Sequence, residues 1–444
     1  MKVKFYISAS ILLLVFSSCA VQKKVSSPYQ PIINQIETAP ANQQHQVGFV
    51  LRELGGNQDL VSINADHYFT PASNTKLFTF YTALNMLDDS VPTFQYLIKK
   101  DSLIIWPMAD ASFLHPDFMT QKAFDFLKNA NQNIYMVDGR YQGEKFGKGW
   151  SWDDYNDDYQ AEITDFPLYA NSLKVSVKNG KLKYSPDLPS MYLSDVTINN
   201  QLKRIKRGLE NNDLQIPQNV DFNYHQTIPL HLSHSIIENL LTDTLLATGL
   251  VTKPVESLSW RPIPTDAKVF YSIKTDSLYQ YMLQNSDNFL AEELLLNCAA
   301  NQNLTMSTDS VIYFSQSNYL TDLPDKIQWK DASGLSRLNL VTPRDLSTLL
   351  QKIYDKVGDE KLLFSLLPNG GKSGTLRNMF KNGEAPFVFA KSGSLSNNYN
   401  LSGYLIGKSG KKYVFSLMNN NFVQPSSNIR AEVENLLTFI HNNY

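Results

Sequence analysis

The sequence predicts a mixed α/β protein of the α+β type, which combines strands paired as hairpins with helices. Three observations lead to this fold class. Strand-like runs at 47–51 and 60–63 flank Gly55-Gly56, as in a hairpin. Apolar residues recur at helical spacing over 71–87. Residues 173–184 alternate in character around Asn179-Gly180, which is a strong hairpin signal.

The composition narrows the class of protein. The chain has 444 residues, 43% of them hydrophobic, and 40 Lys+Arg against 42 Asp+Glu give a formal net charge of -2. This apolar fraction excludes a disordered chain. At about 150 residues per domain, the length suggests two or three domains. A near-neutral charge argues against a nucleic-acid partner, because binding to phosphates needs a basic face.

The first residues resemble an export signal. Lys2 and Lys4 precede an apolar run from Phe5 to Phe16, and Ser17-Ser18-Cys19 follows. This predicts a signal peptide over 1–18, since the run is shorter than the roughly 20 apolar residues that span a bilayer. Small residues before a cysteine resemble a bacterial lipobox, which implies lipidation of Cys19. The alternative is an ordinary signal peptide with an incidental cysteine.

The predicted lipid anchor at Cys19 places the protein in the cell envelope, in the periplasm and attached to a membrane, which would be the outer one in a Gram-negative cell. Residues 19–46 are rich in Gln, Ser, Pro and Asn and predict a tether with one short helix. Cys298 is the other cysteine. It lies in an apolar helical pattern that begins at Phe289, which predicts a buried core thiol.

The first candidate for chemistry is the start of the helix at 71–87. Ser73 and Lys76 are three residues apart, so they lie on one helix face. A lysine shielded from water can lose its proton and serve as the base for a serine nucleophile. Ser-x-x-Lys also occurs at Ser409 and Lys412, but in a turn between two strand-like runs, where the pair would not share a helix face.

Two further motifs follow Ser73 in the chain. Ser286-Asp287-Asn288 opens another apolar helix, and Lys391-Ser392-Gly393 follows the strand-like run 386–390. The combination of Ser-x-x-Lys, Ser-Asp-Asn and Lys-Thr-Gly is a known signature of class A β-lactamases and penicillin-binding proteins. Each motif alone is weak evidence for this signature, because short motifs recur by chance. The order of the three motifs and the helix or strand beside each make the combination specific.

The chain resembles a class C low-molecular-mass penicillin-binding protein, of the D-alanyl-D-alanine carboxypeptidase/endopeptidase family. Besides the three motifs, it shares 71–77, 149–154, 333–339, 340–344 and 401–404. The resemblance implies the penicillin-binding protein/serine β-lactamase-like transpeptidase fold, an antiparallel sheet with helices, interrupted by a long, largely β insertion. We expect a catalytic domain made of 47–96 and 266–444, with the inserted part at 97–265.

The resemblance also implies a catalytic role for each motif. Lys76 would accept the proton of Ser73, whose oxygen attacks the carbonyl of the penultimate D-Ala to form an acyl-enzyme that water hydrolyses. Ser286 would relay the proton toward the leaving amine. Asn288 would hold the substrate amide and bond Lys76.

The remaining site residues are expected to bind the substrate. Lys391 would supply positive charge near the substrate carboxylate, and Ser392 would offer it a hydroxyl. Asp287, Gly393 and Ser394 complete the expected substrate-binding set, and the backbone N–H groups of Ser73 and Ser394 would form the oxyanion hole.

The implied partners are peptidoglycan peptides ending in D-Ala-D-Ala, and β-lactams as inhibitors that acylate Ser73. No metal or organic cofactor is implied. Three alternatives remain open: a serine β-lactamase, a non-catalytic cell-wall binding lipoprotein, and an endopeptidase that cuts peptide cross-links.

Some features depart from the family pattern or fall outside it. Ser392 stands where the family usually has Thr, and Ser373 precedes Gly374-Thr375-Leu376 where relatives have Asp, which leaves the role of that loop open. His225, His231 and His234 lack the spacing of a zinc enzyme, so no metal site is predicted. Acidic and aromatic residues alternate over 150–159, where a loop between domains is favoured over a cation or sugar site.

Overall fold

The computed structural model describes residues 27–187, 196–381 and 385–444, so Cys19 and the predicted signal lie outside the described residues. Its first part is a five-stranded sheet in the order β14-β15-β16-β1-β2. All neighbouring strands pair antiparallel, and β14 lies at one edge of the sheet. The strands are β14 (Val388–Leu395), β15 (Asn398–Ile406), β16 (Lys412–Asn420), β1 (Gln46–Glu53) and β2 (Asp59–Ile63).

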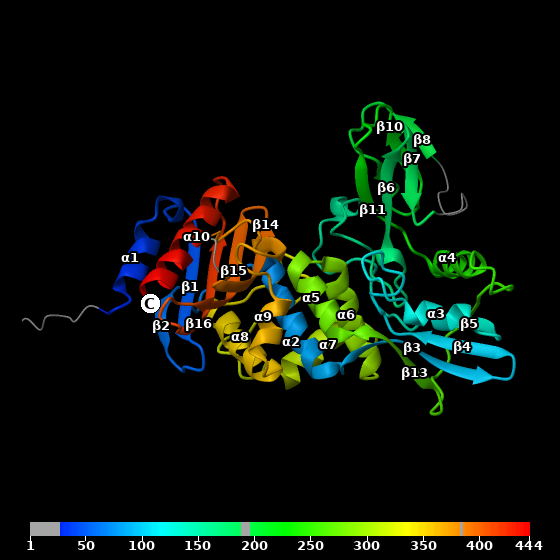
Figure 1. Cartoon of the computed structure of the whole chain (residues 1–444), viewed down its shortest axis with the longest axis horizontal. Coiled ribbons are helices and arrows are strands. Elements are labelled where there is room, and N and C mark those ends of the chain that lie inside the picture. The colour runs from blue at the N-terminus through cyan, green and yellow to red at the C-terminus, as the bar shows by residue number, and fades with distance from the viewer. Residues whose placement is uncertain (1–26, 188–195, 382–384) are drawn as a thin grey trace, which may run out of the picture.

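Helices cover both faces of this sheet (Figure 1). On one face α10 (Ser426–Asn443) and α1 (Gln30–Thr38) share a core with the sheet. On the other face lie α8 (Pro343–Val357), α9 (Glu360–Leu366) and α2 (Lys76–Met86). The hairpin predicted around Gly55-Gly56 is confirmed as β1 and β2.

Part of the predicted tether belongs to the folded domain. The short helix expected there is α1, and Ile32 and Ile36 on one of its faces are buried. A 3-10 turn, η1 (Pro40–Asn42), follows and buries Ala41. Residues 30–42 are therefore packed against α10 and the sheet, in the segment where the sequence predicted a tether with one short helix.

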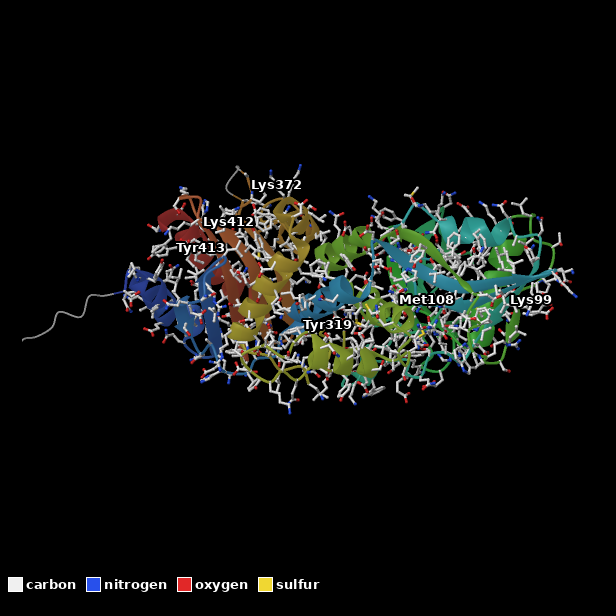
Figure 2. The ribbon with its side chains drawn as sticks, turned by 90° about the horizontal axis from the view of Figure 1, so that it is seen from below. Lys99, Met108, Tyr319, Lys372, Lys412 and Tyr413 are labelled. Carbon is white, nitrogen blue, oxygen red and sulfur yellow. The ribbon has the colours of Figure 1, made fainter. Side chains whose placement is uncertain are left out.

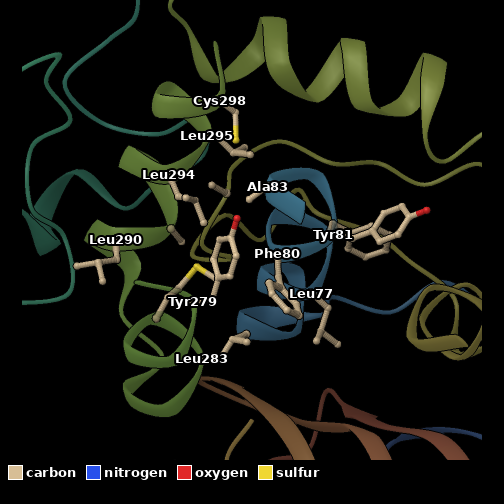
Figure 3. Packing of buried hydrophobic residues seen from close by; sticks show 14 of the residues in the cluster. Leu77, Phe80, Tyr81, Ala83, Tyr279, Leu283, Leu290, Leu294, Leu295 and Cys298 are labelled. Atoms are coloured by element: carbon tan, nitrogen blue, oxygen red, sulfur yellow. The ribbon is translucent and has the colours of Figure 1, made fainter. Parts of the chain in front are cut away.

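A helical layer joins the sheet to the rest of the molecule. It contains α2, α5 (Thr275–Asn285), α6 (Asn288–Asn301) and α7 (Thr308–Asn318). Figure 3 shows Phe80 of α2 and Tyr279 of α5 pointing toward one another, with ring centroids 5.2 Å apart. Cys298 of α6 is fully buried beside Leu295, which confirms the prediction of a core thiol. Burial raises the pKa of this thiol above its ordinary value.

The insertion is mostly β-structure. Its main sheet has the order β12-β5-β4-β3-β13, in which β3 pairs antiparallel with β13 and β4 while β5 pairs parallel with β4 and β12. These strands are β12 (Glu256–Leu258), β5 (Asn133–Val137), β4 (Ser102–Pro107), β3 (Ser90–Lys99) and β13 (Lys268–Lys274). The chain leaves the helical layer along β3 and returns to it along β13, and these two strands pair with each other.

Two small sheets and two helices complete the insertion. The hairpin predicted around Asn179-Gly180 is confirmed as β6 and β7, with both turn residues at positive φ. The remaining elements are β6 (Ser172–Lys178), β7 (Lys181–Ser185) and β11 (His225–Pro229) in one sheet, β8 (Val196–Asn199), β9 (Lys206–Arg207) and β10 (Leu214–Pro217) in the other, and α3 (Lys122–Lys128) and α4 (His234–Leu246).

The molecule is elongated, with the catalytic sheet at one end and the insertion at the other (Figure 1). Figure 2 shows Lys99, at the end of β3, far from Tyr413 on β16. Among the residues that the structure describes, none of the helices has the length and apolar character to cross a membrane.

Candidate active site

Ser73 and Lys76 lie at the start of α2, in a 3-10 turn, η2 (Ala72–Thr75), that runs into the helix. The Lys76 Nζ donates to Ser73 Oγ at 3.0 Å. Lys76 is fully buried, whereas Ser73 is half-buried. The predicted pair therefore has the geometry of a base beside a nucleophile that a ligand can reach.

Two other acceptors hold the Lys76 amine in place. The Nζ donates to Asn288 Oδ1 at 2.6 Å and to the Ser333 carbonyl at 2.7 Å. Burial lowers the pKa of Lys76 to about 8, although the carboxylates of Asp287, Asp331 and Glu292 favour the charged form. An amine with a pKa of about 8 is neutral in about a tenth of the molecules at pH 7, far more than an exposed lysine, and the neutral form can accept a proton from Ser73.

The Ser-Asp-Asn motif forms the corner between α5 and α6. Ser286 ends α5 in the left-handed conformation, at φ 58°. The Asp287 carboxylate caps α6 by accepting the Leu290 N–H at 2.8 Å. Asn288 is thereby turned toward Lys76, and its Nδ2 donates to the Tyr159 carbonyl at 2.9 Å. Asp287, expected among the substrate-binding residues, fixes this corner.

Lys391 lies on the edge strand β14, opposite the corner. Its buried Nζ donates to Ser286 Oγ at 2.9 Å and to the Ser392 carbonyl at 2.6 Å. Burial, and then the positive charge of Lys76, hold the pKa of Lys391 well below its usual range. The two lysines and two serines therefore form hydrogen-bonded pairs, Lys76–Ser73 and Lys391–Ser286, on the two sides of one site.

The loop whose role the sequence left open contacts Ser392. The Ser392 Oγ donates to Thr375 Oγ1 at 2.7 Å, and Thr375 lies in a 3-10 turn, η5 (Gly374–Leu376). Sequence reasoning missed Thr375 because the two hydroxyls are 17 residues apart and join different elements. This contact fixes the direction of the Ser392 hydroxyl.

Gly393 lets β14 approach the nucleophile. A Cβ at this position would lie 2.4 Å from the Pro71 carbonyl oxygen and 3.0 Å from the Ser73 nitrogen. Only glycine fits without displacing that turn. Ser394, the next residue along β14, is exposed and pairs with Tyr399 of β15.

The buried carboxyl group of Glu292, which sequence reasoning missed, holds the Ser333 segment whose carbonyl accepts a hydrogen bond from Lys76. Glu292 Oε1 accepts the Ser333 N–H at 2.9 Å, and its Oε2 accepts the Ala332 N–H at 3.2 Å. Burial and the neighbouring Asp331 raise the pKa of Glu292. Glu292 follows Asn288 by four residues, so both lie on one face of α6, and this spacing is the signal that could have found it.

Asp331 organises the same loop. Its carboxylate accepts the Gly334 N–H at 3.0 Å, the Ser336 N–H at 2.7 Å and the Trp150 indole N–H at 2.9 Å. Gly334, at φ +84°, lies so close to Ala72 that a Cβ would meet its carbonyl oxygen at 1.9 Å. Trp150 belongs to the acidic and aromatic loop at 150–159, so this loop contacts the segment around Asp331, which agrees with the domain-contact loop favoured from the sequence.

The other Ser-x-x-Lys match has a different environment. Lys412 lies on β16, and its Nζ pairs with Glu360 Oε2 at 2.6 Å. Ser409 precedes it in the turn after β15 and donates to the Tyr444 carbonyl. No contact between Ser409 and Lys412 resembles that between Ser73 and Lys76 in the described part of the chain. Figure 2 shows Lys412 beside Tyr413 on the sheet.

Known proteins resemble this chain over most of its length. The model of the D-Ala-D-Ala carboxypeptidase 3 (S13) family matches residues 30–439. The penicillin-sensitive carboxypeptidase A of Dictyostelium discoideum is 26% identical over 406 residues, which cover 78% of this chain and 76% of that protein. The D-alanyl-D-alanine carboxypeptidase DacB of Haemophilus influenzae is 23% identical over 448 residues, which cover 90% of each.

A solved structure has the same fold. The crystal structure of penicillin binding protein 4 (dacB) from Haemophilus influenzae matches with a TM-score of 0.74 at 18% identity, covering 93% of this chain and 99% of that one. A second structure of that protein, complexed with a β-lactam, matches with a TM-score of 0.67 at 18% identity, covering 94% and 99%. The fold expected from the three motifs is therefore confirmed.

Proposed function

Because the chain belongs to the D-Ala-D-Ala carboxypeptidase 3 (S13) family, we propose that it is a serine D-alanyl-D-alanine carboxypeptidase with Ser73 as its nucleophile. The observation that carries the assignment of the nucleophile is the bond of 3.0 Å from Lys76 to Ser73, made by a buried amine whose pKa is about 8. Its substrates are peptidoglycan peptides that end in D-Ala-D-Ala, and β-lactams acylate the same serine.

The acylation step uses Lys76 and Ser286 for proton transfer. Neutral Lys76 takes the proton of Ser73, and the freed oxygen attacks the carbonyl carbon of the penultimate D-Ala. The backbone N–H groups of Ser73 and Ser394 stabilise the oxyanion that forms. Ser286 gives its proton to the leaving amine and regains one from the neighbouring lysines. Terminal D-Ala departs, and water then hydrolyses the ester and frees Ser73.

Lys391 and Ser392 recognise the terminal carboxylate of the substrate. Burial and the positive charge of Lys76 both disfavour the charged form of Lys391, so an entering carboxylate favours that form by pairing with it. The Ser392 hydroxyl, held by Thr375 at 2.7 Å, can turn its proton from Thr375 to the carboxylate. Ser392 lacks the methyl group of the threonine that is usual in the family, but it keeps the hydroxyl group that donates to the carboxylate.

The decisive experiment follows the covalent adduct by mass. Purified mature protein is incubated with a fluorescent penicillin, in parallel with Ser73→Ala and with Ser409→Ala as the matched control from the other Ser-x-x-Lys sequence. We expect a persistent adduct on wild type and on Ser409→Ala, and none on Ser73→Ala. Rapid release of hydrolysed penicillin would indicate a serine β-lactamase instead. The absence of both adduct and hydrolysis would leave a non-catalytic cell-wall binding role.

The location of the protein is a further part of the proposal. The basic residues and apolar run before Cys19 support export through a signal peptide, and the lipobox-like sequence supports acylation of Cys19. The protein then acts in the periplasm from a membrane anchor, within reach of the peptidoglycan peptides proposed as its substrates.

A further inference from the structure

The mechanism leaves unused a cavity of about 260 Å³ behind the Ser-Asp-Asn corner, where the insertion meets α5 and α6. Its lining includes His115 and Asp117 from the loop after β4, Lys174 from β6, Tyr281 from α5, and Asp287 and Phe289 from the corner. Figure 1 shows β6 and β11 rising next to α5 and α6 at this junction. Since Asp287 and Phe289 flank Asn288, a molecule in the cavity would lie next to the catalytic corner.

His115 offers this cavity a fixed hydrogen-bond donor. The ring is only 4% exposed, and its Nδ1 accepts the Asp117 N–H at 3.2 Å. Burial lowers the pKa of His115 to about 4, so the ring is neutral at neutral pH and its proton is on Nε2. Within the described ranges, Nε2 has no hydrogen-bond partner. Nε2 is therefore a donor that an acceptor entering the cavity can use.

The floor of the cavity is aromatic and rigid. The His115 ring packs against Tyr281 with centroids 5.3 Å apart and against Phe289 at 6.4 Å. The Tyr281 hydroxyl donates to Asp117, which keeps both side chains in place. A preformed apolar floor with a few polar groups is the usual construction of a small-molecule site.

The rim carries charges of both signs. The Lys174 Nζ lies 3.6 Å from Asp117 Oδ1, and the lysine side chain remains 48% exposed with donors to spare. Asp158 and Asp287 contribute two further carboxylates to the lining. Lys174 and His115 together suit a carboxylate, while Asp117 and Asp158 suit an ammonium group. The volume is below the roughly 300–1,000 Å³ of drug-sized pockets, which suits a single amino-acid residue.

We propose that this cavity is an accessory subsite that binds an amino-acid residue with a free carboxylate and a free amine, supplied by the second peptide of a cross-linked substrate. The first peptide occupies the groove at Ser73. The subsite binds and takes no part in bond breaking. This proposal rests on the proposed function and extends it from single peptides to cross-linked ones.

The test compares substrates that differ only in whether they reach the cavity. Lys174→Gln and His115→Gln are assayed on a single peptide ending in D-Ala-D-Ala, on its cross-linked dimer, and for acylation by penicillin. We expect both variants to raise KM for the dimer by about tenfold, the loss of one charged hydrogen bond, with kcat unchanged. KM for the single peptide and penicillin acylation stay at the wild-type values. Lys178→Gln, at the exposed end of the same strand, is the matched control and should match wild type throughout.

Each other outcome overturns a distinct claim. An unchanged KM for the dimer, or an equal rise for both peptides, overturns the subsite while penicillin acylation of wild type still upholds Ser73. Wild type that penicillin does not acylate overturns the proposed function and the subsite with it. If His115→Gln loses acylation because the buried ring is needed for folding, Lys174→Gln decides alone, since its side chain is half exposed.

Discussion

Lys76 connects three parts of the chain that are far apart in the sequence. Its amine donates to Ser73, to Asn288, which is 212 positions away, and to Ser333, which is 257 positions away. The amine therefore stays in place even when it loses charge. The environment that lowers its pKa is also the one that aligns it with the nucleophile.

The rate of acylation should follow the titration of Lys76. The base is active when neutral, and its pKa is about 8, so the rate rises as pH increases through about 8 and then levels. Stopped-flow measurement of penicillin acylation from pH 6 to 10 checks this. Lys76→Arg, which stays protonated, should lose about 10² to 10⁴ in rate. A flat profile across this range would contradict the assignment of Lys76 as the base.

Glu292 should act as a positioning residue. Replacing it with glutamine in Glu292→Gln puts an amide in place of one acceptor of the Ala332 and Ser333 N–H groups, so the Ser333 carbonyl shifts from Lys76. We expect the acylation rate to fall about tenfold, as for one unsatisfied buried group. Burial raises the pKa of Glu292 to about 8, so its carboxyl ionises over the same pH range as Lys76. Glutamine cannot ionise, so the charge that favours protonated Lys76 no longer forms and the pH midpoint should move down.

The neighbouring Glu293 provides the control. It is equally buried, and burial holds the pKa of its carboxyl well above the usual range, but it is not among the carboxyls whose charge acts on Lys76. Acylation and the pH midpoint should stay near wild type. Equal losses in both variants would mean that Glu292 serves only the packing of α6.

The sequence predicted the residues of the site better than their supports. The three motifs could be picked out because their residues, their order and the helix or strand beside each one are visible in the sequence, and the structure brings these residues together in one site. Glu292, Asp331, Ser333 and Thr375 were missed as members of the site because their contacts join segments that only the folded chain brings together. The roles of the motif residues in catalysis remain predictions until the variants are assayed.

At the scale of elements, the close approach of β14 to the turn at Ser73 depends on one missing side chain. In Gly393→Ala, the new Cβ would lie 2.4 Å from the Pro71 oxygen, so the strand or the turn must move. We expect penicillin acylation to fall about a hundredfold, comparable to the loss of an oxyanion-hole donor. The rate constant of acylation is the measurement.

Gly403→Ala separates this local effect from general damage to the sheet. Gly403 lies on the adjacent strand β15, where a Cβ would be 2.3 Å from the Phe389 oxygen. It should lower the Tm as much as Gly393→Ala does, with a smaller effect on acylation of the folded protein. If both variants lose acylation in proportion to their Tm, the crowding at Gly393 has no special role.

Among the elements, hairpins were predicted well because their signals are contained in a few residues. The β6–β7 turn at Asn179-Gly180 is an example. The division of the chain into 47–96 with 266–444 and 97–265 remains a prediction. Its boundaries fall at β3 and β13, whose pairing joins residues more than 150 positions apart, and no local pattern signals such a pair.

At the scale of the whole molecule, the predicted anchor decides where the enzyme works. Cys19→Ser removes the thiol that would carry the lipid, so we expect the protein to move from the membrane fraction to the soluble periplasmic fraction with its penicillin acylation intact. Fractionation followed by penicillin labelling checks this. Cys298→Ser is the control, because a fully buried thiol cannot anchor the chain, and this variant should stay with the membranes. Retention of Cys19→Ser in membranes would contradict lipidation at this residue.

The two ends of the described chain lie against each other. Tyr29 stacks on Tyr444 with ring centroids 5.1 Å apart, and the Tyr444 hydroxyl donates to the Pro28 carbonyl at 2.8 Å. Chain ends this close can be joined by a short linker, and a circular permutant can then be opened at an exposed hairpin such as Asn179-Gly180. Such a permutant would present new ends at the insertion and leave the catalytic sheet continuous. It offers a way to attach a probe or a surface at the opposite end of this long molecule from Tyr29 and Tyr444.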